Sequence, residues 1–205
     1  GFRGGDFTGF KSSENTNYSN DIPHIAATYS IIAVLNMINI PLLSKSFLTY
    51  LSKELNINEL SITSDDIINN IKLYQNKSGC ISCLYSNTNS EQDSRFIYCA
   101  YLIRELMILE QLSIDLNIPL DHSLFYDILY LKNPDRINSH IITEKYLQLK
   151  IKHKDFINAD RNLMNYLASV YCYDGGFSIF PSGESNAGIT FCSISSLRSE
   201  EHTSE

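Results

Sequence analysis

Apolar residues recur at helical spacing along most of the chain. Examples are Ile67, Ile71 and Tyr74, followed later by Leu163, Tyr166, Leu167 and Val170. Intervals of three and four residues place such side chains on one helix face, whereas a strand would alternate. The pattern predicts an all-helical protein with helices over 24–38, 41–55, 64–75, 92–113, 120–131, 143–152, 156–171 and 187–197. Ser64, followed by two aspartates, is the expected N-cap of the third helix.

Three segments, 21–35, 90–104 and 183–197, share an internal pattern. In each, a polar residue precedes an aromatic by five positions, and the pairs are His24 and Tyr29, Asp93 and Tyr98, and Asn186 and Phe191. Two of the segments follow a loop that contains glycine, which tolerates positive φ. The repeated unit is predicted to be a loop, an inward helix and an outward helix, with 112–154 as an insertion.

Helical hairpins repeated in this way can stack as a solenoid or close into a double-layered ring. In a ring, the polar residues that begin the inward helices would gather around one mouth. Unpaired backbone N–H groups at helix starts favour an anionic ligand, so this mouth is the expected binding site.

The amino-acid composition excludes some classes of binding partner and indicates a cell compartment. Sixteen basic and twenty-three acidic residues give a formal charge of −7, which excludes a general nucleic-acid surface. The most apolar stretch, 24–43, is interrupted by polar residues and a proline, so no transmembrane segment is expected. Five cysteines, an odd number, suit a reducing compartment and predict a cytoplasmic protein. The chain starts Gly-Phe-Arg without methionine, and a fragment is expected.

Four motifs occur in order. They are Gly-Phe-Arg-Gly at 1–4, Pro-His-Ile-Ala-Ala-Thr-Tyr at 23–29, Asp-Ser-Arg-Phe-Ile-Tyr-Cys-Ala at 93–100, and Asp-Gly-Gly-Phe at 174–177 with Glu-Ser-Asn-Ala-Gly-Ile-Thr-Phe-Cys at 184–192. Together they make the chain resemble the beta subunits of protein prenyltransferases, and the first and third favour the type I geranylgeranyl enzymes over the farnesyl and Rab-specific ones. The resemblance spans residues 1–197 apart from insertions, and the charged 198–205 is expected to be a non-native tail.

The resemblance implies an alpha-alpha barrel, here a partial ring, that pairs with a helical alpha subunit. Such enzymes transfer a geranylgeranyl group from its diphosphate to the cysteine of a C-terminal C-a-a-X sequence, often with X as leucine. A zinc ion lowers the pKa of the substrate thiol. The expected partners are therefore the alpha subunit, geranylgeranyl diphosphate and C-a-a-X proteins.

The resemblance also implies roles for individual residues. The expected peptide-binding residues are His24, Ala26, Ala27, Glu91 and Phe96. The expected isoprenoid-binding residues are Arg95, Tyr98, Cys99, Gly188 and Cys192, with Arg95 at the junction of the two ligands. Read without the resemblance, His24 could simply cap a helix, Glu91 and Arg95 could be an exposed i,i+4 pair, and the remaining residues could be ordinary core.

Two departures from the family pattern weaken the site. Asn186 stands where the family has a diphosphate-binding histidine, and an amide cannot become cationic. The family zinc site is an Asp-x-Cys pair with a later histidine, but no cysteine here follows an aspartate by two residues. No metal ligand or catalytic residue is therefore assigned, zinc is expected only in a complete enzyme, and this chain alone is expected to be inactive.

Other interpretations remain open. A farnesyltransferase beta subunit is the alternative within the family, and a non-catalytic helical-repeat binding module is the alternative outside enzymes. The Cys80-x-x-Cys83 pair is a weak zinc or redox signal without a second pair of ligands, so it is interpreted as structural. An open ring should also expose apolar surface and be marginally stable.

Overall fold

The computed structural model describes residues 24–56, 58–84, 90–118, 139–157 and 163–201. In these ranges the chain forms α-helices and one 3₁₀ turn, with isolated bridges in place of strands. The helices are α1 (Ile25–Met37), α2 (Lys45–Glu54), α3 (Ser64–Ile71), η2 (Lys72–Tyr74), α4 (Ser94–Leu116), α6 (Ser139–Lys152), α7 (Met164–Ser169) and α8 (Ala187–Glu201). The predicted all-helical class is confirmed. None of these helices combines the length and hydropathy that a membrane span needs.

Local capping chemistry sets where the helices start. The Thr63 side chain accepts from the Asp66 N–H while the Asp66 carboxylate accepts from the Thr63 N–H, which makes a capping box. The cap of α3 is therefore Thr63, and the expectation of Ser64 is wrong by one residue. Similarly, α2 begins at Lys45, later than the predicted position 41, because the Ser44 hydroxyl accepts from the Phe47 N–H.

Two other predicted helices differ from the structure. Of the helix predicted over 156–171, α7 is present in the described residues, whereas Phe156 and Ile157 lie in a bend, fully buried. In contrast, α8 continues past the predicted end at 197 to Glu201. The helix predicted over 120–131 lies outside the described residues, as do the motif at 1–4 and the end of the predicted tail.

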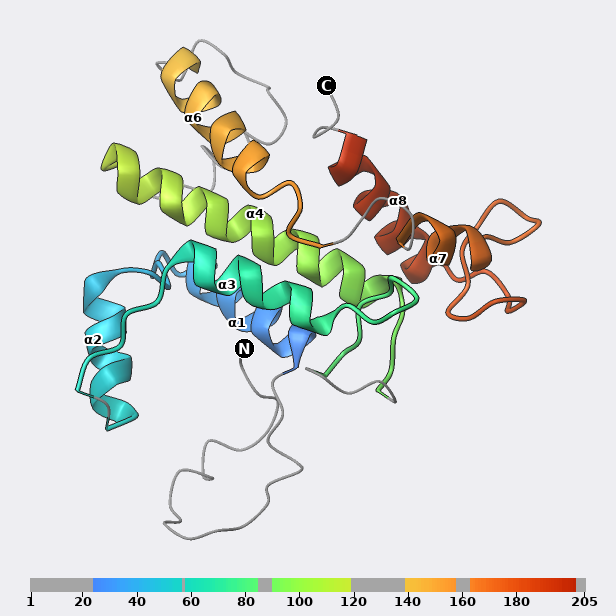
Figure 1. Cartoon of the computed structure of the whole chain (residues 1–205), viewed down its shortest axis with the longest axis horizontal. Helices are drawn as coiled ribbons and strands as arrows, with labels where there is room; N and C mark the ends of the chain where they lie inside the picture. The colour runs from blue at the N-terminus through green and yellow to red at the C-terminus, as the bar shows by residue number, and fades with distance from the viewer. Residues whose placement is uncertain (1–23, 57, 85–89, 119–138, 158–162, 202–205) are drawn as a thin grey trace, which may run out of the picture.

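Helix α4 lies at the centre of the molecule and packs against α1, α3, α6 and α8 (Figure 1). The helices α1, α4 and α8 form one row, and α3 and α6 lie against α4. Fifteen of the 23 residues of α4 are buried, which fits a helix that is enclosed on several sides. This layered arrangement of α1, α4 and α8 with α3 and α6 agrees with the double-layered ring, one of the two architectures that the repeats allow.

The loops that precede two of the inward helices repeat the same hydrogen bonds. In the first loop, backbone N–H groups donate from Asn76 to Cys80 O (2.9 Å), from Gly79 to Asn76 O (3.1 Å) and from Ser82 to Tyr74 O (2.8 Å). In the second loop, the equivalent bonds run from Cys172 to Gly176 O (2.8 Å), from Gly175 to Cys172 O (3.1 Å) and from Ser178 to Val170 O (2.9 Å). Gly79 and Gly175 occupy equivalent positions with φ of 89° and 86°. Glycine is favoured there because other residues are strained at such φ values. The sequence repeat is thus also a structural repeat.

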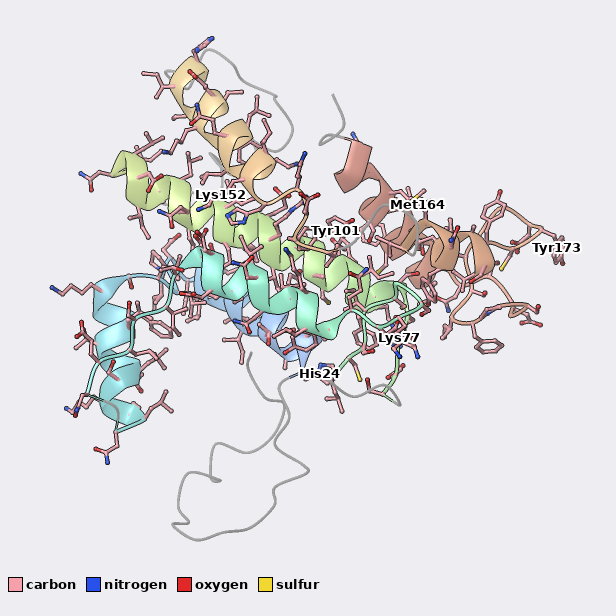
Figure 2. All side chains as sticks on the ribbon, viewed as in Figure 1. His24, Lys77, Tyr101, Lys152, Met164 and Tyr173 are labelled. Carbon is pink, nitrogen blue, oxygen red and sulfur yellow. The ribbon has the colours of Figure 1, made fainter. Side chains whose placement is uncertain are left out.

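A buried charge cluster joins α4 to α6. The Arg104 guanidinium donates to Glu105 Oε1 at 2.7 and 3.1 Å, and Tyr146 of α6 donates to the other Glu105 oxygen at 2.7 Å. Arg104 also lies 5.1 Å from the ring of Tyr101 and 4.6 Å from that of Phe156 (Tyr101 is labelled in Figure 2). Because a buried ion costs free energy unless it is paired, these contacts fix how α6 and residue 156 dock on α4.

A second buried carboxylate, further along α4, joins this helix to the connection between α1 and α2. Glu110 is fully buried and accepts hydrogen bonds from the backbone N–H groups of Leu42 (3.0 Å) and Leu43 (2.9 Å) and from the Asn36 side chain (2.9 Å). Burial raises the pKa of Glu110, while the three donors oppose that shift. These bonds tie the connection between α1 and α2 to α4.

The C-terminal end of α6 is held to α3 by charge. Lys152 Nζ lies 2.6 Å from Asp65 Oδ2, and His153 Nε2 lies 3.1 Å from Asp65 Oδ1. Burial lowers the pKa of His153 and Asp65 opposes this, while the cations of Lys152 and Arg104 lower it further. His153 is therefore held mainly in its neutral form.

We expect the free energy of unfolding to decrease as the pH falls below about 6.5, the usual pKa of histidine in an unfolded chain. The folded-state pKa is lower, so the unfolded chain takes up the proton first over this interval. Urea unfolding at pH 5 to 8 measures the effect, and His153→Gln should reduce the slope. His140 is 94% exposed, so His140→Gln is the matched control. An identical pH slope in the two variants would contradict this assignment.

Candidate functional site

The three polar residues of the repeat each cap an inward helix. His24 Nδ1 accepts from the Ala26 N–H at 3.2 Å, and Asp93 Oδ1 accepts from the Arg95 N–H at 2.8 Å. Asn186 Oδ1 accepts from the N–H groups of residues 188 and 189 at 2.9 and 3.2 Å. A polar side chain is required there because the first N–H groups of a helix have no partner within the helix.

These caps change the expectation of an anion-binding mouth. At the starts of α1, α4 and α8, the N–H groups of residues 26, 95, 188 and 189 already bond to the cap side chains, so these four donors are not free for a ligand. Asp93 also places a carboxylate at the start of α4, and an anion would be repelled there. The caps therefore use part of the donors that an anionic ligand would need, and the anion-binding mouth stays a prediction.

The starts of the three helices lie at the same end of the row (Figure 1). The rings of His24 and Phe96 meet edge to face, with centroids 5.9 Å apart, which joins the starts of α1 and α4. Tyr98 and Phe191 meet in the same manner at 5.5 Å, which joins α4 to α8. The structure thus brings together residues that lie far apart in the sequence, as the repeat predicted.

An ion-pair cluster lies at the start of α4. Arg95 Nη2 lies 2.5 Å from Glu91 Oε1 and 2.5 Å from Asp93 Oδ2, and the two carboxylates raise the pKa of the guanidinium. The predicted contact between Glu91 and Arg95 is therefore present. Arg95 also lies 5.5 Å from the ring centroid of Phe96, so the charge cluster adjoins the pair of His24 and Phe96.

The thiols predicted to line the isoprenoid site lie on facing helices. Cys99 is buried in α4 and Cys192 is half-buried in α8. Burial raises the pKa of both, to about 12 for Cys99, and the charges of Asp93 and Arg95 act on both thiols. Both cysteines are therefore protonated near neutral pH and act as small apolar groups.

The other residues predicted to bind the peptide or the isoprenoid differ in how exposed they are. Ala26 and Ala27 are half-buried on α1, and Phe96 is buried with 5% of its surface exposed. Gly188 is exposed at the start of α8. Phe96 is therefore part of the apolar core, whereas the three small residues are at least partly accessible.

The exposed apolar surface expected of an open ring is also present. Val34 and Met37 on α1 are 55% and 68% exposed, and Phe191 and Ile194 on α8 are 58% and 52% exposed. Tyr173 is fully exposed in the loop after α7, where Figure 2 shows it at the tip. Exposed aliphatic and aromatic side chains of this kind favour an apolar ligand or a protein contact.

Metal ligands do not converge in the described part of the chain. There, no group of three or more His, Cys, Asp or Glu side chains is placed to hold a metal ion. These residues do not provide the zinc site that the resemblance implies. Cys80 and Cys83 are both buried free thiols, and burial raises the pKa of Cys80 to about 12, which is unfavourable for metal or redox chemistry.

A separate polar pocket of about 450 Å³ lies between α3, α4 and α6. Its two lysines are paired across it, Lys145 with Asp115 at 3.2 Å and Lys152 with Asp65 at 2.6 Å. None of the predicted site residues lines this pocket. The arrangement therefore looks like a hydrated ion-paired contact between helices.

Comparison with known proteins agrees with the helical architecture described above. Residues 1–204 match the prenyltransferase alpha-alpha toroid domain. The chain belongs to the prenyltransferase alpha-alpha toroid family. Over 199 residues, 97% of this chain, it is 25% identical to the geranylgeranyl transferase type-1 subunit beta of Arabidopsis thaliana. It spans 36% of the length of that relative.

The family assignment agrees with the fold. We call α1, α4 and α8 the inner helices, after the inward helices that the repeat predicts, and their capped starts form the candidate site. The match reaches residue 204 and includes the continuation of α8 into the segment expected to be non-native. The domain boundary at 197 stays a prediction.

The sequence pattern marked Asp93 only as the polar residue of the second repeat and did not indicate a role for it in the candidate site. Asp93 is fully buried and contacts Arg95 through its backbone and its side chain. The signal was the Asp-x-Arg spacing at the start of a helix, which brings the second carboxylate oxygen close to the arginine side chain. Spacing alone did not show that the carboxylate would be buried.

We expect Asn186→Ala to destabilise the start of α8 by about 1 kcal/mol, because two N–H groups lose their acceptor. Asn186→Asp keeps an acceptor and should retain the stability. Amide hydrogen exchange at residues 188 and 189 measures the local effect. Equal protection in the alanine variant and the unmodified chain would contradict the capping role.

Proposed function

We propose that this chain is part of a protein geranylgeranyltransferase type I beta subunit. The whole enzyme would transfer a geranylgeranyl group to the cysteine of a C-terminal C-a-a-X sequence, often with leucine at X. The observation that carries the proposal is the row of inner helices with its capped starts at one end, where His24, Arg95 and Phe96 adjoin one another. The likeness to a named type-1 beta subunit supports the same choice.

The proposed ligands divide between two sets of side chains. The peptide end would contact His24, Ala26, Ala27, Glu91 and Phe96. The isoprenoid would lie along Tyr98, Cys99, Gly188 and Cys192, with Arg95 at the junction. The contact between Tyr98 and Phe191 supports this division, because it provides an aromatic wall across two inner helices.

The reaction joins the substrate cysteine sulfur to the first carbon of the isoprenoid. The bond between that carbon and the diphosphate oxygen breaks, and the diphosphate leaves with the electron pair. The described residues would contribute by binding the apolar chain, excluding water from it and orienting the peptide. Zinc in the complete enzyme stays an expectation of the resemblance.

Charge at the start of α4 argues against diphosphate binding there. Glu91 and Asp93 together outweigh Arg95 by one negative charge, and the amide of Asn186 is neutral. A diphosphate requires cationic partners, so those must come from other parts of the complete protein. We therefore place the apolar chain and the peptide, rather than the diphosphate, against these residues.

The proposed assembly is a heterodimer with a prenyltransferase alpha subunit in the cytoplasm. The 205 residues alone should transfer no isoprenoid, even with an alpha subunit present, because no cysteine in the chain belongs to an Asp-x-Cys pair. Zinc-dependent prenylation of a C-a-a-L peptide by these residues would contradict that expectation.

In the complete protein with its alpha subunit, we expect geranylgeranyl diphosphate to outcompete farnesyl diphosphate for transfer to a C-a-a-L peptide. Tyr98→Ala should weaken isoprenoid binding roughly tenfold, because it removes apolar contact area. Tyr173→Ala is the matched control, since this tyrosine is fully exposed at a loop tip. Competition assays and titrations with a fluorescent isoprenoid diphosphate measure both effects. Preference for the farnesyl donor would favour a farnesyltransferase instead.

A further inference from the structure

Asp93 makes contacts with Arg95 beyond the one hydrogen bond that caps α4. Its Oδ1 atom accepts from the Arg95 N–H, which satisfies the start of α4. Asn186 occupies the same place in the third repeat and caps α8 through an amide oxygen. His24 caps α1 through a ring nitrogen. Because neutral side chains cap the two related helices, the carboxylate at position 93 needs another explanation.

Burial makes that carboxylate costly. Asp93 is 0% exposed, and a buried ion is unfavourable unless it is paired. Its partner is the Arg95 side chain. Arg95 Nε lies 3.0 Å from both carboxylate oxygens, and Nη2 lies 2.5 Å from Oδ2. This is a forked contact, which restricts the orientation of the guanidinium more than a single hydrogen bond would.

Neighbouring groups fix the other sides of the guanidinium. Glu91 accepts from Nη2 at 2.5 Å, and the Phe96 ring lies against the guanidinium, 5.5 Å from its centre. His24 meets the same Phe96 ring edge to face. Nη1 of Arg95 has no hydrogen-bond partner among the described residues. The donors of Nη1 are thus the ones left for a ligand, next to the ring of Phe96.

We propose that Asp93 is a positioning residue, whose second carboxylate oxygen orients the Arg95 guanidinium so that Nη1 can donate to the bound peptide. This role rests on the proposed function, because it takes the peptide as the ligand. Asp93 itself touches no substrate. The two carboxylates offset the charge of Arg95, so the ligand group is an oxygen acceptor bound through directed hydrogen bonds rather than through net charge.

The orientation of Arg95 can be tested without any ligand. In the full chain, NMR should show the Arg95 Nε–H protected from solvent exchange. Asp93→Asn keeps an acceptor for the helix cap. It places an N–H₂ group or a weaker acceptor next to the guanidinium, so the protection of Arg95 Nε–H from exchange should decrease at least tenfold. Asp93→Ser, a second capping variant, should do the same. Glu91→Gln should retain protection, because Glu91 contacts only Nη2.

Helix content from circular dichroism shows whether each variant is folded, and the serine variant decides the question if the asparagine variant does not fold. Unchanged protection of Nε–H in a folded Asp93 variant would overturn the proposal. So would an unprotected Nε–H in the unmodified chain, since Asp93 would then not hold the guanidinium.

A double-mutant cycle tests the consequence for peptide binding in the complete protein with its alpha subunit. Asp93→Asn and Arg95→Ala should each weaken binding of a C-a-a-L peptide roughly tenfold, and the double variant should lose no more than Arg95→Ala alone. Additive losses would mean that Asp93 acts independently of Arg95, which overturns the proposal. If the unmodified protein binds no such peptide, the proposed function fails, and the exchange measurement still decides whether Asp93 positions Arg95.

Discussion

The structure depends on how the inner helices begin. The first N–H groups of a helix need acceptors from outside it, so each inner helix carries a polar residue at its start. His24, Asp93 and Asn186 provide these acceptors. Because α1, α4 and α8 lie side by side with their starts at one end, the three capping side chains lie at the same end and form a polar rim there. Fold and candidate site therefore have a common origin.

The same constraint governs the chemistry of the rim. Side chains that cap the helices use N–H groups that an anionic ligand would otherwise bind. Arg95, the cation at this end, is compensated by Glu91 and Asp93. Among the described residues, the donor of Arg95 that remains for a ligand is Nη1, next to the ring of Phe96. A hydrogen-bond donor beside an apolar ring is better suited to a peptide and a hydrocarbon chain than to a diphosphate.

Central burial of α4 explains why charged residues occur inside the protein. Arg104 and Glu105 neutralise each other, and Tyr146 of α6 donates to the second carboxylate oxygen of Glu105. Glu110 satisfies the backbone where the chain turns from α1 to α2. Each of these groups is costly to bury alone, so they favour one docking arrangement of the neighbouring helices over others.

The sequence by itself determined the helical class and the repeat, because helical periodicity depends on residues only a few positions apart. It placed the cap of α3 one residue late, since Thr63 and Ser64 both carry hydroxyls and the partnership with Asp66 distinguishes them. Only the tertiary structure decided that Phe156 leaves its predicted helix to pack on Arg104, and that Asp93 is buried against Arg95. Those outcomes depend on which surfaces meet when distant segments pack, and local spacing carries no information about that.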